Sequence, residues 1–227
     1  MWAVLNRKPP NQWVCEDFLA AGQQDMEVAL DPFCKQHKIR TRPRTLLEIG
    51  CGAGRHTGHL AERFKRVVAL DVSDELLKTA RENIKADNVE FVRGNGVNLD
   101  VIETASMGFV WSVIVFQHIP DPEIQYAYLR EVGRVLRPGG WFLIHLYGDV
   151  IEQARVYAAW QQRADAGELQ GWSELGKPEL VADRWKTSTR TAVTSAGVRQ
   201  ALGVGGLTLK YEDLPGTAKW WIGGQKA

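Results

Sequence analysis

The chain has 227 residues, of which 44% are hydrophobic, so it is long enough to bury a core and is most simply one domain. Lysine plus arginine (28) nearly balances aspartate plus glutamate (27), which disfavours a global attraction to nucleic acid or to an anionic membrane. The three cysteines lack the spacing of a disulfide framework or a structural zinc site, and no stretch has the pattern of a signal peptide or a membrane span. We therefore expect a cytoplasmic protein with a small-molecule substrate and no membrane contact.

The first 38 residues predict an amphipathic helical segment. Apolar side chains, Trp13 among them, recur between charged ones after the Pro9-Pro10 break. A basic run then precedes the first strand and comprises Lys35, Lys38, Arg40, Arg42 and Arg44. Such a run is more often a solvated linker than a patch that binds RNA, and the balanced total charge favours the linker.

A buried strand followed by a glycine-rich turn stands at residues 45–57, Thr-Leu-Leu-Glu-Ile-Gly-Cys-Gly-Ala-Gly-Arg-His-Thr. Three glycines follow the strand at alternate positions: Gly50, Gly52 and Gly54. They allow positive φ and a close approach of a ligand to the free N–H groups of the next helix. Arg55 stands where a dinucleotide fingerprint needs glycine, and the Gly-Lys-Ser/Thr of a P-loop is absent. Glu48 suits an ammonium or a hydroxyl better than a phosphate, so the turn predicts a site for a cationic nucleoside.

A second buried strand is predicted over residues 67–70 and ends at Asp71, 21 residues after Gly50. One strand, one turn and one crossover helix bring this carboxylate beside the glycine turn, where it can accept both ribose hydroxyls. Ser73 and the acids after it already cap the next helix, so we favour ribose binding over a capping role for Asp71.

Two more strands are predicted over residues 89–92 and 109–115. The third is followed by Asn95-Gly96 and the fourth by Gln117-His118. Because parallel strands end at the same edge of a sheet, we expect these residues to lie in one crevice with the glycine turn. A helix over residues 122–136, a fifth strand over 141–144, a helix over 195–202 and strands over 207–211 and 219–223 complete the prediction.

The stretch from residue 45 to residue 146 resembles the class I S-adenosylmethionine-dependent methyltransferases. Their first motif, acid-x-Gly-x-Gly-x-Gly, matches Glu48 to Gly54, and Arg-Val-Leu-Arg-Pro-Gly-Gly before the fifth strand is also similar to the family. The resemblance implies S-adenosylmethionine as the cofactor and a doubly wound, Rossmann-like α/β sheet of seven strands with the last antiparallel. It also implies a single domain with four parts, a helical N-terminal lid (1–38), a cofactor-binding half (39–147), a substrate-pocket insert after the fifth strand (148–193) and a final helix with a strand hairpin (194–227).

The resemblance implies cofactor contacts for ten residues, Glu48, Gly50, Cys51, Gly52, Gly54, Asp71, Val72, Asn95, Gly96 and Phe116. Family members usually carry an aspartate where Asn95 stands and an acid where Gly108 begins the fourth strand. The amide oxygen of Asn95 can still accept a hydrogen bond from the adenine amino group. The Asn95-Gly96 pair is equally a good tight turn, and both interpretations stay open.

Methyl transfer from a sulfonium needs the protein to align the nucleophile, exclude water and, for a hydroxyl, remove a proton. His118 is the expected base because it follows the fourth strand and histidine has a reference pKa of about 6.5. A purely structural role for this histidine is about as plausible. The expected substrate-binding residues are Trp13, His145, Trp172 and Trp185, although packing explains each of them too. We expect no metal at the site.

We therefore predict transfer of a methyl group to a small molecule, with a hydroxyl as the acceptor. The Asn/Asp-Pro-Pro-aromatic and Pro-Cys motifs of nucleobase methylators are absent after the fourth strand. Three alternatives remain: an RNA or protein methyltransferase that uses the basic run, a non-catalytic module that binds S-adenosylmethionine, and a nicotinamide-dependent reductase. The last is weak because Arg55 breaks the dinucleotide fingerprint.

Overall fold

The structure is a computed structural model that describes residues 15–148, 191–213 and 220–227, with no side-chain detail for residues 15–18. The predicted substrate contacts of Trp13, Trp172 and Trp185 and most of the predicted insert lie outside the described residues. Seven strands form a mixed sheet in the order β3-β2-β1-β4-β5-β7-β6, which confirms the predicted fold class. The chain divides into two units, Met1–Arg93 with Met107–Trp111, and Gly94–Ser106 with Ser112–Ala227. No helix within the described ranges has the length and apolar character needed to span a membrane.

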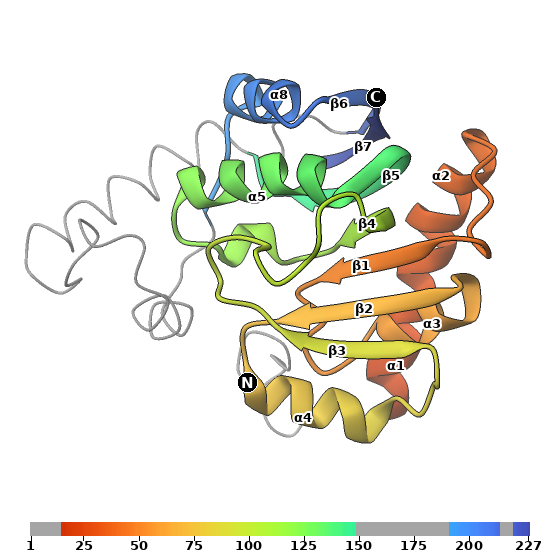
Figure 1. Ribbon diagram of the computed structural model, residues 1–227. Helices are drawn as coiled ribbons and strands as arrows, with labels where there is room; N and C mark the ends of the chain where they lie inside the picture. Colours follow the sequence, from red (N-terminus) through yellow and green to blue (C-terminus); the bar gives the residue numbers. More distant parts are fainter. Residues whose placement is uncertain (1–14, 149–190, 214–219) are drawn as a thin grey trace, which may run out of the picture. The chain divides into compact units, whose positions relative to one another are not determined.

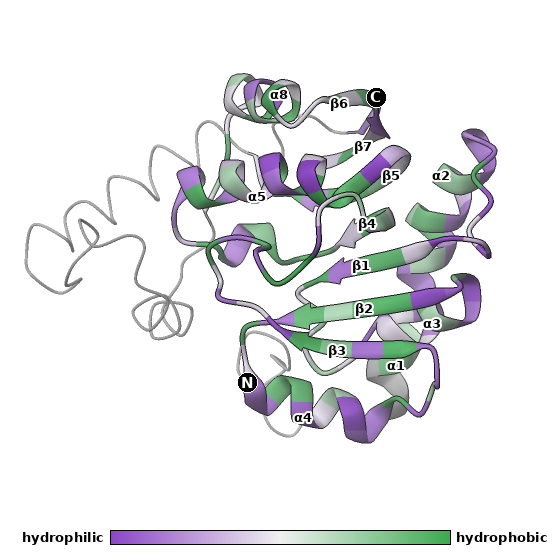
Figure 2. Cartoon of the chain, in the orientation of Figure 1, coloured by the Kyte–Doolittle hydropathy of each residue, from purple (hydrophilic) through white to green (hydrophobic). Residues whose placement is uncertain are grey.

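The first unit contains four parallel strands, β1 (Thr45–Ile49), β2 (Arg66–Asp71), β3 (Val89–Arg93) and β4 (Met107–Ser112). β1 pairs with β2 and β4, and β2 pairs with β3, so that β1, β2 and β3 lie side by side (Figure 1). β1 and β2 are buried over nearly their whole length, and their mostly apolar course is visible in Figure 2. Continuous apolar strands of this kind are typical of parallel sheets that are covered on both faces.

Helices connect these strands and precede them. α3 (Thr57–Arg63) joins β1 to β2, and α4 (Asp74–Asn83) joins β2 to β3, with the Ser73 hydroxyl accepting a hydrogen bond from the Leu76 N–H at 3.3 Å. From residue 15 onward the N-terminal segment is helical as predicted and contains α1 (Cys15–Asp25), the π-helix η1 (Met26–Leu30) and α2 (Asp31–Gln36). A π-helical turn is rare and often accompanies a functional site.

The second unit contains η2 (Phe116–His118), α5 (Pro122–Val135), β5 (Leu136–Leu146), α8 (Ser195–Val204), β6 (Leu207–Asp213) and β7 (Trp220–Lys226). β7 pairs antiparallel with both β5 and β6, which confirms the predicted antiparallel last strand. α5 and α8 pack closely, because a Cβ added to Gly133 would lie 2.0 Å from the carbonyl oxygen of Gly205. Glycine is therefore the residue that permits this helix contact.

Several predicted boundaries differ from the structure, and two of them concern the central strands. The fourth strand ends at Ser112 instead of residue 115, and Ile114 has a φ of 58°, which a β-branched residue in a strand rarely adopts. The fifth strand begins at Leu136 instead of residue 141, so the Arg137-Pro138-Gly139-Gly140 run, which follows the end of α5 as predicted, lies within the strand.

Candidate functional site

The glycine turn leaves β1 and crosses the end of β2. The N–H groups of Gly50 and Cys51 both donate to the carbonyl of Leu70, at 2.7 and 3.0 Å. Gly50, Gly52 and Gly54 have φ values of 75°, 54° and 93°. Side chains with a Cβ strongly disfavour this region, so the alternation of glycines in the sequence follows directly from the backbone course of the turn.

Asp71 ends β2 and is fastened to the glycine turn. One carboxylate oxygen accepts from the Gly52 N–H at 2.8 Å, and the other accepts from the Ser73 N–H at 2.9 Å. Burial raises the pKa of Asp71, and these backbone donors oppose the shift. Each oxygen has a second lone pair, so the carboxylate keeps the capacity to accept two ribose hydroxyls. The predicted proximity of Asp71 to the turn is confirmed.

Glu48, near the end of β1, is only 1% exposed. Its Oε2 accepts a hydrogen bond from the Thr57 hydroxyl at 2.7 Å, whereas Oε1 accepts none from the described residues. Burial raises the pKa of Glu48 to about 7, although the Thr57 hydrogen bond acts in the opposite direction. A buried carboxylate oxygen without a donor is costly for the folded protein, and a bound cation removes that cost. This site therefore fits an ammonium group.

Two residues near Glu48 were not among the predicted site residues, His56 and, on the far side of its ring, Asp25. His56 is 5% exposed, and its Nε2 lies 2.8 Å from Oδ2 of Asp25, the last residue of α1. Its other ring nitrogen lies 3.8 Å from Oε1 of Glu48. No signal in the sequence relates Asp25 to the turn, because the two are about thirty residues apart and the contact depends on how α1 packs.

The loop at Asn95 belongs to the second unit and is stabilised by hydrogen bonds among its own residues. The Asn95 side-chain oxygen accepts from the N–H groups of Val97 and Asn98, at 2.8 and 3.0 Å, while its amide nitrogen donates to Asn98 and Asp100. Both lone pairs of the oxygen are used in this arrangement, which favours the tight-turn interpretation over adenine recognition by this side chain. Gly96 has a φ of 78°, as such a turn requires.

The remaining predicted residues of the second unit lie around η2 and β5. Phe116 is fully buried and packs edge-on against Tyr128. His118 is half-buried, with its Nε2 3.1 Å from the amide nitrogen of Gln117. When the Gln117 amide donates this hydrogen bond, Nε2 is its acceptor. His145 is buried in β5 against the ring of Trp221, as expected of a packed residue.

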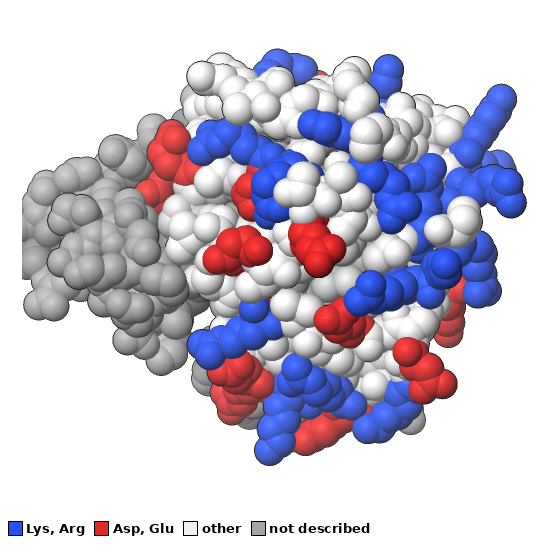
Figure 3. Space-filling model, in the orientation of Figure 1, with Lys and Arg blue, Asp and Glu red and all other residues white. Residues whose placement is uncertain are grey.

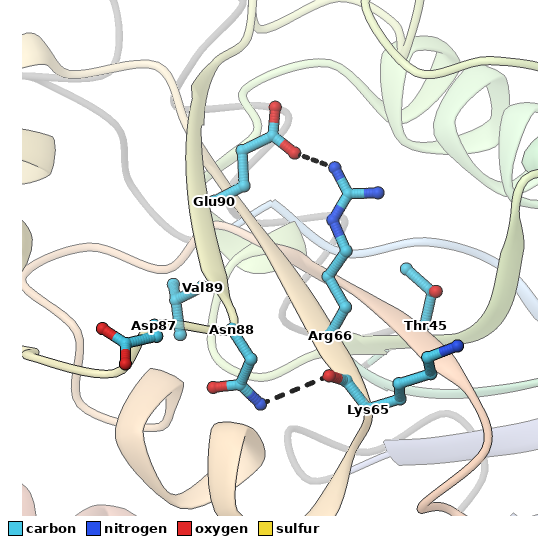
Figure 4. Close-up of a pocket in the computed structure, with 7 residues that line it drawn as sticks. All are labelled: Thr45, Lys65, Arg66, Asp87, Asn88, Val89 and Glu90. Carbon is cyan, nitrogen blue, oxygen red and sulfur yellow. Dashed lines mark hydrogen bonds and ion pairs between the residues drawn. The ribbon is translucent and has the colours of Figure 1, made fainter.

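A surface hollow lies at the opposite ends of the strands of the first unit (Figure 4). Its walls include Arg66 and Glu90, which form an ion pair, and Asn88, whose side chain donates to the carbonyls of Ala61 and Phe64. These groups satisfy one another at the amino ends of the strands. Ligands of open α/β sheets bind at the carboxyl ends, so this hollow is not the candidate site.

Comparison with known proteins agrees with the fold and with the glycine turn. Residues 47–144 match the family model described as a methyltransferase domain. The structure of a SAM-dependent methyltransferase from Methanosarcina mazei is similar, with a TM-score of 0.61 and 20% identity over 85% of this chain and 96% of that one. Residues 47–144 are thus similar to methyltransferase domains, and the fold is that of the solved SAM-dependent methyltransferase.

Two curated proteins are similar in sequence. The biotin biosynthesis bifunctional protein BioHC of Cellvibrio japonicus is 33% identical over 149 residues, which are 64% of this chain and 27% of that protein. The ubiquinone biosynthesis O-methyltransferase of Xanthomonas oryzae is 33% identical over 97 residues, 42% of this chain and 39% of that protein. The chain thus matches less than half of the length of either relative.

Residues of the first unit have groups that fit S-adenosylmethionine. The glycine turn exposes backbone to a nucleoside, Asp71 has acceptors for ribose hydroxyls, and Glu48 has one buried acceptor for the ammonium of the methionine part. When bound, S-adenosylmethionine supplies an activated methyl group on a sulfonium.

Proposed function

We propose that this protein methylates a hydroxyl group of a small molecule. The observation that carries the methyl-transfer part of the proposal is the pair of buried carboxylates near the ends of neighbouring strands, Glu48 and Asp71, on either side of a turn of positive-φ glycines. The O-methyltransferase of Xanthomonas oryzae, which is 33% identical over 97 residues, supports the choice of oxygen as the acceptor atom. The balanced charge of the chain supports a small acceptor over a nucleic acid.

His118 is the proposed general base. It follows β4 by six residues and stands in η2, where its Nε2 lies 3.1 Å from the amide nitrogen of Gln117. A neutral imidazole has the unprotonated nitrogen that a base needs, and proton transfer by a positioned side chain contributes about 10² to 10⁴ in rate. Once Gln117 releases Nε2, this nitrogen can accept the proton of an attacking hydroxyl.

The test is a methylation assay with S-adenosylmethionine and a panel of phenols, aliphatic alcohols, amines, thiols and carboxylic acids, followed by mass spectrometry of the product. A methylated hydroxyl compound supports the proposal, and methylation confined to another acceptor class contradicts it. With the preferred acceptor, His118→Gln is expected to lower kcat by at least about 100-fold while calorimetry shows unchanged affinity for S-adenosylhomocysteine. Full activity of this variant would exclude His118 as the base.

A second candidate function is methylation of RNA, and one observation favours it. Lys and Arg side chains gather over α2 and the segment that leads into β1 (Figure 3). Four of the basic residues there are exposed and form no ion pair with the described residues: Lys35, Lys38, Arg40 and Arg42. If they contact phosphates, RNA affinity is expected to fall steeply with salt, by roughly one power of salt concentration per contact. RNA binding that does not respond to salt, or no binding, would leave the small-molecule function.

A further inference from the structure

His56 lies where two hydrogen-bond acceptors face each other inside the protein. Its Nε2 lies 2.8 Å from the carboxylate of Asp25, and an ionised carboxylate can only accept, so Nε2 carries the ring proton. Burial lowers the pKa of His56 despite the opposing effect of Asp25, which keeps the ring neutral. Nδ1 is then an unprotonated acceptor, and it faces Oε1 of Glu48 at 3.8 Å.

These two atoms do not satisfy each other. A separation of 3.8 Å is longer than a hydrogen bond, and neither atom supplies a proton when Glu48 is ionised. The position of the ring is nevertheless well fixed, because its edge packs at right angles to Trp111 with 6.0 Å between the ring centroids. Thr57 already donates to the other oxygen of Glu48, so Oε1 and Nδ1 together require a donor from outside this group of side chains.

An ammonium group meets this requirement. It has three N–H donors, and one nitrogen can lie about 2.8 Å from both acceptors at once, the usual length of a charge-assisted hydrogen bond. A hydroxyl has a single proton to donate and cannot satisfy both atoms. The ionised Glu48 supplies the opposite charge, and the imidazole nitrogen orients the ammonium by accepting one of its N–H groups.

We propose that His56 binds the ammonium of the methionine part of the cofactor together with Glu48, and that Asp25 is a positioning residue that fixes the His56 tautomer. The inference rests on the proposed methyl transfer only in that S-adenosylmethionine is the ligand. It adds a binding residue from the start of α3 and a contribution from the N-terminal helix, which the glycine motif does not contain.

The packing of α1 supports the role of Asp25. A Cβ added to Gly22 would lie 2.0 Å from the carbonyl oxygen of Arg55, so α1 contacts the glycine turn without an intervening side chain. Asp25 also lies 3.5 Å from the guanidinium of Arg55. One carboxylate at the end of α1 thus contacts two consecutive residues of the turn, which fixes its orientation toward His56.

The experiment measures binding of two ligands by calorimetry: S-adenosylhomocysteine and its deamino analogue, in which a hydrogen replaces the amino group. His56→Phe is expected to weaken S-adenosylhomocysteine by about 10-fold or more and to leave the deamino analogue unchanged, since only the former has the ammonium. Asp25→Ala, at a partly exposed position, is expected to lower the preference for S-adenosylhomocysteine over the deamino analogue as well, by a smaller factor.

His59→Phe is the matched control. His59 stands one turn further along α3 and also contacts α1, through the carbonyl of Leu19 at 2.9 Å, but its ring is not among the groups beside Glu48. Both affinities are expected to stay as in the wild type. Thermal unfolding of every variant identifies any that fail to fold, in which case Asp25→Ala and His56→Gln decide the question.

The outcomes separate the two hypotheses. If His56→Phe weakens both ligands equally, or neither, His56 does not bind the ammonium and the inference is overturned while the proposed function stands. If the wild-type protein does not bind S-adenosylhomocysteine, the proposed function itself fails and the inference fails with it.

Discussion

The buried carboxylate of Glu48 should destabilise the unliganded protein at neutral and alkaline pH. Its pKa rises from an ordinary value of 4.5 to about 7, chiefly through burial. The groups around it are the Thr57 hydroxyl, Asp71, Arg55 and the His56 ring. A raised carboxyl pKa means that the unfolded chain ionises first as pH rises, so stability from this group is full below pH 4.5 and lost progressively up to about pH 7.

The size of the effect follows from the shift. A difference of about 2.5 pKa units at about 1.4 kcal/mol each gives roughly 3 kcal/mol as the cost of ionising Glu48 in the folded state. Glu48→Gln keeps the shape of the side chain and removes the titration. As pH rises from 4.5 to 8, the unfolding free energy of the variant is therefore expected to increase relative to that of the wild type. The expected increase is up to about 3 kcal/mol.

Urea unfolding of both proteins at half-unit steps between pH 4.5 and pH 8 measures this difference. A second arm measures the affinity for S-adenosylhomocysteine at pH 8, where Glu48→Gln should bind more weakly because the charge opposite the ammonium is gone. A stability difference that does not change with pH would refute the buried, cation-binding role of Glu48. A stabilised variant with unchanged affinity would show that the carboxylate is buried but is not part of the ligand site.

Three further predictions test other parts of the structure. Asp71→Ala should weaken S-adenosylhomocysteine by about 1 to 3 kcal/mol in calorimetry, and unchanged affinity would contradict ribose binding by this residue. Gly133→Ala should lower the unfolding free energy by about 1 to 3 kcal/mol because its Cβ would lie 2.0 Å from the Gly205 carbonyl, whereas Gly203→Ala, with open space around the added Cβ, should be neutral or slightly stabilising. The Cys34 thiol, whose pKa burial raises to about 12, should react with a disulfide reagent in the native protein only on the timescale of local opening, as mass spectrometry would detect; rapid modification would contradict its burial.

The sequence by itself determined the sheet and the cofactor turn of this protein. Continuous apolar runs identify parallel strands, because such strands are buried on both faces and need no alternation. The alternating glycines predict a turn that only residues without a Cβ can follow, and the 21-residue distance from Gly50 to Asp71 fixes a strand–helix–strand unit whose two ends must meet. These features are local or depend on one crossover connection, and so they can be predicted from the sequence.

Tertiary structure decided which side chains surround Glu48 and where the fourth strand ends. His56 becomes an acceptor beside Glu48 only because α1, distant in sequence, brings Asp25 to the other side of its ring. Ile114 is part of a β-type run in the sequence, yet the chain turns there with a positive φ that its β-branched side chain opposes. The environment of His56 depends on packing between segments that are not neighbours in the chain, and local preference carries no information about such contacts.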